Sequence, residues 1–364
     1  MGKRGPKPMF LEVACPNEEC EQYGCTGQGN IVGNGTYETK SGRVRKYICR
    51  ACGKVFCDRS NTIFYDLRTS EDKVVLALKL ILKGMSQRSI AEVLEVCPKS
   101  VSTWLSRASD QSEAIMETKL KDLEVSRVEM DELWTFVGKK GVPKNEEYED
   151  DGTWIWVSMA SECRMVLAYA IGERNQTMAK DIVAKTAKRL ASIPLFVTDG
   201  LKFYSRALLE QYGFWRTYPA TGKRGRPRRD RLSPCEKLRY AQVIKIRQGR
   251  RLKEVIKKKV FGKDIDAELI STSLIERLNL TLRQDNNRIS RKTIGFSKKI
   301  EGLRQQMNLY FANYNFCRGH RSLKQPDCAG KIVTCSPARY FGLTNRNLDL
   351  KELLVIPYYK MSTN

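Results

Sequence analysis

Four cysteines near the start of the chain form two closely spaced pairs. Cys15 and Cys20 form the first pair, and Cys49 and Cys52 form the second. Thiolates at this spacing are typical of a zinc ribbon, in which two short knuckles close a tetrahedron around one Zn²⁺. The stretch between the pairs contains glycine, asparagine and serine residues that form turns, and a segment this short needs a staple such as a metal. The sequence therefore predicts a zinc ribbon over residues 13–65.

Cys25 and Cys57 lie in the same region and are surplus to the four. They could be free thiols, or either could replace one of the four ligands. The chain has 12 cysteines in all, a number that disulfides in a secreted protein would also explain. The first residues contain no apolar stretch long enough for a signal peptide, so we favour metal thiolates in the reducing cytosol.

The charge of the chain limits its partners. With 364 residues it is expected to form two or three domains. Its 65 lysines and arginines against 41 acidic residues give a formal charge of +24, which favours nucleic acid as the partner. An anionic membrane is the alternative, but no apolar run reaches the roughly 18 residues that span a bilayer. Residues 1–12 form a basic tail that resembles a degenerate minor-groove hook, although a disordered, solvated tail also explains it.

Residues 70–110 have the pattern of a helix-turn-helix domain. Apolar residues recur at helical spacing from Ser70, Gly84 ends the first helix, and Ser86 can cap the second. Pro98 suits the first turn of a third helix, whose Trp104 and Leu105 would pack inward. A three-helix bundle without a role in DNA binding is the alternative. In the favoured interpretation the third helix faces the major groove with four residues, Lys99, Ser100, Ser102 and Thr103.

After a linking helix expected at residues 111–124, the period changes from helical to strand-like. Three successive strands are predicted between residues 125 and 173, followed by a helix, a short buried strand that ends at Asp199, and another helix. This order predicts an α/β domain with a mixed sheet, which we place at residues 125–315. Residues 316–364 are left as a C-terminal extension, which is expected to pack on the α/β domain.

Residues 219–263 interrupt this pattern with a basic insertion. The run KRGRPRR contains the Arg-Gly-Arg-Pro core of an AT-hook, an extended motif that fits a narrow A·T minor groove. Arg226 and Arg228 are therefore candidate DNA contacts. A solvated charged loop is the alternative, but a run of a single sign argues against plain surface decoration.

Three carboxylates are candidate metal ligands. Asp131 lies in the first predicted strand of the α/β domain, Asp199 at the end of the fourth, and Glu276 on a later helix whose same side presents Asn279 and Arg283. Carboxylates on neighbouring strands and a docked helix could hold two Mg²⁺ ions about 3.5–4 Å apart, as phosphoryl transfer requires. The arginine could bind a phosphate. Spacing alone leaves four nearby acids open as alternatives: Glu129, Glu132, Asp264 and Glu268.

Three blocks of the sequence, MDELWTFVG, VTDGLKFY and STSLIERLNLTLRQDNNRISRKTIGFSKK, resemble the catalytic blocks of the insertion-sequence-one family of DDE transposases. The cysteine ribbon and helix-turn-helix resemble that family's DNA-binding protein, here fused in one frame to the catalytic part, and the resemblance covers about residues 13–315. It implies an RNase-H-like fold that binds Mg²⁺ or Mn²⁺, with Asp131, Asp199 and Glu276 as ligands. Arg283 matches a basic position common in DDE enzymes. The basic insertion and the C-terminal His-Arg-Ser-Leu depart from the compact members and indicate a long form.

The function implied by this resemblance is that of a DNA transposase in the prokaryotic cytoplasm, associated with the nucleoid. It would bind terminal inverted repeats and target DNA as a homodimer or higher oligomer, and would cleave and transfer strands with two metal ions. One alternative is a transcriptional regulator whose transposase-derived fold is inactive, and a second is a ribonuclease H or other nuclease. The intact acidic triad argues against the first, and the two-part DNA-binding front half argues against the second.

Overall fold

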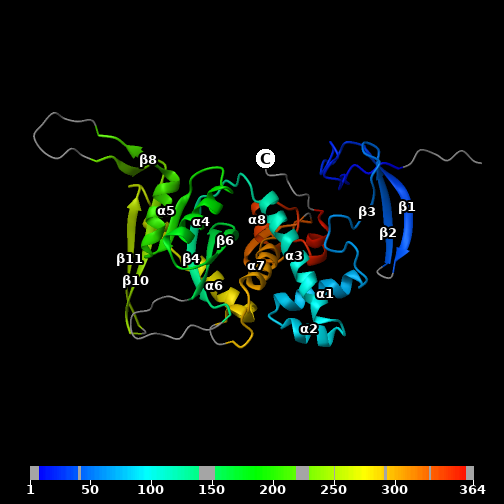
Figure 1. The fold of residues 1–364 in the computed structure, drawn as a ribbon. Helices are drawn as coiled ribbons and strands as arrows, with labels where there is room; N and C mark the ends of the chain where they lie inside the picture. The colour runs from blue at the N-terminus through cyan, green and yellow to red at the C-terminus, as the bar shows by residue number, and fades with distance from the viewer. Residues whose placement is uncertain are drawn as a thin grey trace, which may run out of the picture. The chain divides into compact units, whose positions relative to one another are not determined.

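The computed structural model describes residues 8–39, 42–138, 152–218, 229–249, 251–290, 293–327 and 329–357. The chain divides into two compact units (Figure 1). The first comprises residues 1–118, 305–317 and 347–364, and the second comprises residues 119–304 and 318–346. Both units are therefore assembled from segments that lie far apart in the sequence.

The first unit begins with a three-stranded antiparallel sheet of β1 (Ile31–Thr39), β2 (Gly42–Cys49) and β3 (Val55–Cys57). Its buried core is small, because Ile31 and Tyr47 pack with only three further side chains, Cys15, Cys20 and Cys49. Partly buried aromatic side chains extend this core, and the Phe10 ring meets the Tyr47 ring edge-on at 5.0 Å between centroids. A core of this size needs a staple to be stable.

Three helices follow, α1 (Glu71–Leu82), α2 (Gln87–Val93) and α3 (Pro98–Lys119). Gly84, just after α1, takes a φ of 82°, the left-handed conformation in which helices commonly end. The Ser86 side chain caps α2 by accepting a hydrogen bond from the Ser89 backbone N–H at 3.1 Å. Trp104 and Leu105 of α3 are buried. The structure thus confirms the three helices and the capping that the sequence predicts.

The expected linking helix at residues 111–124 is not a separate element. α3 runs unbroken to Lys119, so residues 111–119 are its last turns. The end of the chain also folds with this unit, through α7 (Ile300–Phe316) from residue 305 onward and α9 (Leu350–Val355). Gln111 of α3 links α9 to the segment before α1. Its side-chain oxygen accepts a hydrogen bond from the Ile63 N–H at 3.0 Å, and its side-chain N–H donates to the Leu354 carbonyl at 2.8 Å. The last described residues therefore pack on the helical part of the first unit, whereas the sequence placed them on the α/β domain.

The second unit is built on a six-stranded mixed sheet with the order β11–β10–β7–β4–β5–β6. β4, β5 and β6 are antiparallel neighbours, while β7 is parallel to β4 and β10 is parallel to β7. The sequence predicted a mixed α/β sheet, and β4, β5, β6 and β7 correspond to the four strands predicted between residue 125 and Asp199. The strand bounds are β4 (Arg127–Thr135), β5 (Thr153–Ala160), β6 (Met165–Gly172), β7 (Leu195–Asp199), β10 (Arg239–Gln248) and β11 (Arg251–Phe261).

The region expected to be a basic insertion contributes two strands to this sheet. β10 pairs with β7 as far as Val243 and Asp199, and the exposed edge strand β11 pairs with β10. Ala241 and Val243 lie in a buried cluster with Leu195 and Val197 of β7. Residues 239–261 are thus integral to the sheet and not an insertion into it. Arg226 and Arg228 lie outside the described residues.

Helices cover both faces of the sheet (Figure 1). α4 (Gln176–Ala187) and α5 (Lys202–Tyr212) lie on one face, where Thr186 bonds Ser158 at 2.7 Å and the Tyr204 ring meets the Trp156 ring at 5.6 Å between centroids. Successive residues of a strand point to opposite faces, so Glu129 of β4 lies on the face away from Met130, which pairs with Ser158. On the other face α6 (Ser273–Asp285) docks on β4, where the Ile275 N–H contacts Glu129.

Smaller elements complete the second unit. A hairpin of β8 (Gly213–Arg216) and β9 (Arg231–Pro234) follows α5 directly. A second hairpin, β12 (His320–Pro326) and β13 (Ile332–Cys335), packs with the short helix α8 (Pro337–Phe341). Among the described helices of both units, none is long and apolar enough to cross a membrane.

Candidate functional site

Asp131 and Asp199 lie on neighbouring parallel strands at matching positions. β4 and β7 pair in register up to Met130 and Thr198, so the next residue on each strand is an aspartate. One carboxylate oxygen from each of Asp131, Glu132 and Asp199 lies within 4.8 Å of the others. The sheet therefore brings together two of the three acids singled out in the sequence, and adds Glu132, one of the four alternatives.

These clustered carboxyls are difficult to ionise. Burial, followed by the charge of Asp199, raises the pKa of Asp131 to about 7. The same two causes raise the pKa of Glu132 to about 8, and burial raises the pKa of Asp199. A divalent cation reverses this effect because it favours the charged form of every carboxylate around it. The cluster thus has the charge and the oxygen atoms that Mg²⁺ or Mn²⁺ binds.

Glu276 lies near this cluster without being part of its tightest group. It is in the first turn of α6, where both of its oxygens accept hydrogen bonds from the Lys245 ammonium of β10 and one accepts from the Thr272 hydroxyl at 2.6 Å. Its charge contributes to the raised pKa of both Asp131 and Asp199, so it lies within their electrostatic reach. A metal bound by Glu276 would have to displace Lys245 from it.

Asn279, one turn after Glu276, contacts the cluster directly. Its side-chain N–H donates to Asp131 Oδ2 at 2.8 Å. Its amide oxygen is buried and has no hydrogen-bond partner within the described part of the chain, a situation that costs free energy. A hard cation would take such an oxygen as a ligand, alongside carboxylates. The donor set at this site therefore fits Mg²⁺ or Mn²⁺.

Glu129 fixes the position of α6 on β4. Its fully buried carboxylate accepts hydrogen bonds from the Ile275 backbone N–H at 2.9 Å and the Ser161 hydroxyl at 3.0 Å, and pairs with Arg127 at 3.3 Å. The Ile275 N–H is one of the donors that a helix leaves unpaired in its first turn, so Glu129 caps α6 from the neighbouring strand. Because the same turn carries Glu276, this contact ties Glu276 to the strand that carries Asp131.

The other alternative acids have different surroundings. Glu132 points to the face opposite Asp131 and pairs with Arg174 at 3.1 Å. Asp264 and Glu268 are exposed, Glu268 within the short 3₁₀ turn η1 (Ala267–Leu269), and neither belongs to the acidic cluster. Of the four alternatives, only Glu132 joins the cluster.

Arg283 donates hydrogen bonds to two backbone carbonyls, those of Ile289 at 3.3 Å and Trp134 at 3.2 Å. These bonds attach the segment after α6, including η2 (Asn287–Ile289), to the end of β4. The apolar side of α6 is buried through Ile275, Leu278 and Leu282. A role for Arg283 in binding phosphate remains a prediction.

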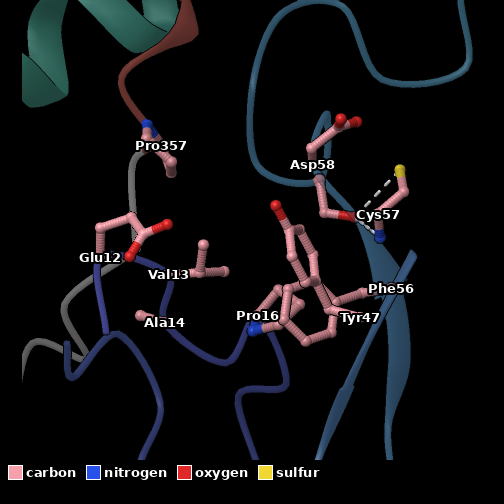
Figure 2. Close-up of a pocket in the computed structure, with 10 residues that line it drawn as sticks. Glu12, Val13, Ala14, Pro16, Tyr47, Phe56, Cys57, Asp58 and Pro357 are labelled. Carbon is pink, nitrogen blue, oxygen red and sulfur yellow. Dashed lines mark hydrogen bonds between the residues drawn. The ribbon is translucent and has the colours of Figure 1, made fainter. Parts of the chain in front are cut away.

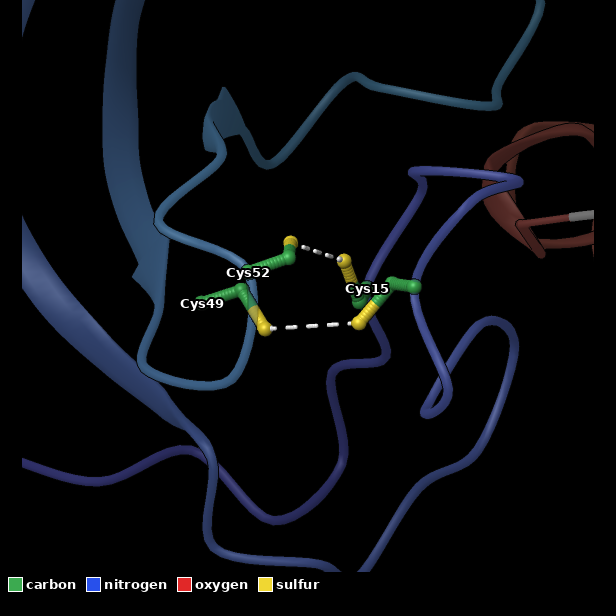
Figure 3. A group of neighbouring side chains, drawn as sticks. Cys15, Cys49 and Cys52 are labelled. Carbon is green, nitrogen blue, oxygen red and sulfur yellow. Dashed lines mark hydrogen bonds between the residues drawn. The ribbon is translucent and has the colours of Figure 1, made fainter.

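The four predicted zinc ligands form one compact group in the first unit (Figure 3). The Sγ atoms of Cys15 and Cys52 lie 3.6 Å apart, and those of Cys20 and Cys49 lie 4.0 Å apart. Zinc–sulfur bonds of about 2.3 Å in a tetrahedron place sulfurs about 3.8 Å apart, so the spacing fits one Zn²⁺, whereas a disulfide needs about 2.05 Å.

Two further features support thiolates in this group. The Asn30 side chain donates a hydrogen bond to Cys49 Sγ at 3.2 Å. A backbone hydrogen bond from Lys54 is the main cause that lowers the pKa of Cys52 to about 6. A low pKa favours the deprotonated form that a metal requires. By contrast, burial raises the pKa of Cys15, and the pKa of Cys20 is also raised, so a bound cation would have to displace the protons of these two thiols.

A small pocket lies beside this group (Figure 2). Its volume is about 70 Å³ and its lining includes Val13, Tyr47 and Phe56. The surplus Cys57 also lines it, with its thiol 3.6 Å from the Ser60 hydroxyl. Cys25 is exposed and bonds the Tyr23 carbonyl. Neither surplus cysteine is among the four clustered thiols.

The predicted recognition residues occupy the first turns of α3. Lys99, Ser102 and Thr103 are exposed, and Ser100 is half-buried. The Thr103 hydroxyl bonds the Lys99 carbonyl of its own helix at 2.9 Å. Three of these side chains are therefore accessible to a ligand of the first unit.

The sequence matches no protein-family profile and no curated protein. Among solved structures, the Mos1 strand transfer complex matches over 38% of this chain and 54% of its own, with 17% identity and a TM-score of 0.18. The mariner Mos1 paired end complex with Mg matches over 37% and 53%, with 18% identity and a TM-score of 0.16.

The Mos1 mariner paired end complex with Mn matches over 40% of this chain and 57% of its own, with 16% identity and a TM-score of 0.17. The chain thus spans about half the length of the proteins it matches.

Proposed function

We propose that the chain is a DNA transposase of an insertion sequence, related to the insertion-sequence-one family. The observation that carries this proposal is the placement of Asp131 and Asp199 on adjacent parallel strands, with Glu276 on the helix docked beside them. Carboxylates that share so small a space serve a metal-dependent reaction better than they serve stability, since burying them uncompensated is costly.

Asp131, Asp199 and Glu276 would hold two Mg²⁺ or Mn²⁺ ions, which when bound stabilise the charge that develops on a phosphate under attack. In the first step, the oxygen of water forms a bond to phosphorus and loses a proton to solvent, while the P–O3′ bond breaks and the released O3′ takes up a proton to become a 3′-OH. In the second step, that 3′-OH loses its proton, its oxygen attacks a phosphate of the target strand, and the displaced O3′ takes up a proton. Asn279 would fix the orientation of Asp131. Glu129 would fix α6, and with it Glu276, to the strand that carries Asp131, so that the same three carboxylates serve both steps.

The same proposal assigns DNA binding to three surfaces. Residues Lys99, Ser102 and Thr103 of α3 would read the terminal repeats, and the zinc ribbon would support that domain. The β10–β11 ribbon, whose exposed strand β11 carries four lysines and an arginine, would contact the phosphate backbone near the acids. Arg226 and Arg228 would extend this contact into the minor groove, and Arg283 would orient a phosphate. The active form would be a dimer or larger oligomer on paired ends.

The test is a cleavage and joining assay with oligonucleotide duplexes from the genomic DNA that flanks the coding sequence. The wild-type chain with Mg²⁺ is expected to cut at one position near each end and to form joint molecules with a target duplex. Asp131→Asn, Asp199→Asn and Glu276→Gln are each expected to bind the duplexes and to produce neither product. Sequence-specific binding by the wild type without products would support a regulator, and unspecific degradation without joints would support a nuclease.

A further inference from the structure

The β8–β9 hairpin exposes two large aromatic side chains. Phe214 is 52% exposed and Trp215 is 68% exposed. They are consecutive on one strand, so they project from opposite faces of the hairpin. None of the residues of β8 or β9 is fully buried, so both rings are open to a binding partner.

The hairpin is held firmly at its base. α5 ends at Tyr212 and β8 starts at the next residue, Gly213. A Cβ at Gly213 would lie 2.2 Å from the Leu209 carbonyl oxygen and 2.9 Å from that of Ser233, so the strand and helix approach too closely for any other residue. The Cys235 N–H also bonds the Tyr212 carbonyl at 3.2 Å. The aromatic side chains are thus presented by a rigid junction.

The charge on the hairpin identifies the kind of partner. Arg216 and Arg231 pair directly across the two strands and are both exposed, although like charges at opposite positions repel. They share a face with Phe214, two residues before Arg216. Neither arginine forms an ion pair with a carboxylate of the described residues. Arg216 instead lies over the Tyr218 ring, 5.6 Å from its centroid.

We propose that this face binds an unpaired nucleotide of the DNA substrate, with Phe214 stacked on its base and Arg216 and Arg231 on the adjoining phosphates. Aromatic rings bind any exposed base because every base has a π-face, and arginines bind phosphate in a planar, two-pronged manner. An intact duplex keeps its bases stacked inside, so the ring can engage only a strand that is open at that point. This inference rests on the proposed function, since it takes the ligand to be the strand being processed.

The experiment compares full-length wild-type and Phe214→Ala protein, without Mg²⁺, on two forms of one duplex. One form is continuous, and the other has a five-nucleotide single-stranded gap that contains 2-aminopurine. The wild type is expected to prefer the gapped form and to quench 2-aminopurine. Phe214→Ala is expected to bind the gapped form about fivefold to a hundredfold more weakly, as for the loss of one stacked base, with binding to the continuous duplex unchanged.

Ile332→Ala is the matched control, because Ile332 is an apolar side chain of the same unit with 62% exposure. Equal binding of the gapped form by wild type and Phe214→Ala would overturn the proposal. So would a change in oligomeric state in Phe214→Ala without a change in DNA binding, which would make the hairpin a protein interface. No step requires cleavage, so loss of activity in the joining assay with normal quenching would count against the transposase function alone.

Discussion

The metal-free chain is expected to lose stability as the pH rises from about 5 to about 8. In the folded chain the pKa of Asp131 is raised from 3.8 to about 7 by burial and by Asp199. Between these values the folded state keeps a proton that the unfolded state has released. The stabilisation is therefore complete below pH about 4 and is lost as the pH passes through about 7.

The size of this effect follows from the shift. About three pKa units at 1.36 kcal/mol each give about 4 kcal/mol for Asp131 between pH about 4 and about 7 as an upper value, of which about 3 kcal/mol falls above pH 5. Glu132, whose pKa is raised to about 8, repels Asp131, so its contribution overlaps and the two cannot be added. A loss of this order is a large part of the stability of most domains.

Urea unfolding followed by tryptophan fluorescence measures the loss, because four of the five tryptophans, all except Trp104, lie in the second unit. Zinc-loaded protein in magnesium-free buffer is compared with the same protein in Mg²⁺, which should restore stability more at pH 8 than at pH 6. Asp131→Asn should flatten the pH dependence, and Asp181→Asn, which alters a carboxylate paired with Lys185 on α4, should not. A wild-type stability that is flat or rises between pH 5 and 8 would refute the reasoning.

Three further predictions concern other parts of the chain. A zinc chelator should unfold the cysteine ribbon, seen as loss of circular dichroism with release of one zinc per chain, and protein purified without chelator but lacking zinc would contradict this. Lys99→Ala should weaken binding to all DNA sequences, whereas Ser102→Ala should relax sequence choice by roughly 1–3 kcal/mol in competition assays. Glu129→Gln should lower stability by about 1–3 kcal/mol, because it removes a charge from the buried hydrogen bonds to Ile275 and leaves Arg127 without its counter-charge.

The elements with local signals could be predicted from the sequence. Paired cysteines, the Ser86 cap, and the strand that ends at Asp199 each have a pattern that depends on few neighbours. Their placement in the structure agrees with the prediction.

The elements that depend on distant partners were missed. β10 and β11 read as a charge run because of their lysines, whereas the core contacts of Ala241 and Val243 are with Leu195 and Val197, on a strand some 45 residues earlier. Glu129 gave only the signal of an acid in a buried strand, and its role depends on the Ile275 N–H, 146 residues away. The Lys245 contact with Glu276 was missed for the same reason, because the two residues lie on different elements 31 residues apart. No single-sequence pattern contains such pairings.

The central claim is that Asp131, Asp199 and Glu276 hold the metal ions of a DNA-transferring site. Its most direct test is an anomalous difference map from crystals of the full chain soaked in Mn²⁺, with Glu276→Gln crystals as the comparison. The account predicts two peaks bounded by the three carboxylates, with the Lys245 ammonium moved away from Glu276, and a weakened or missing peak in the variant. Manganese at surface positions alone, with Glu276 still paired to Lys245, would contradict it.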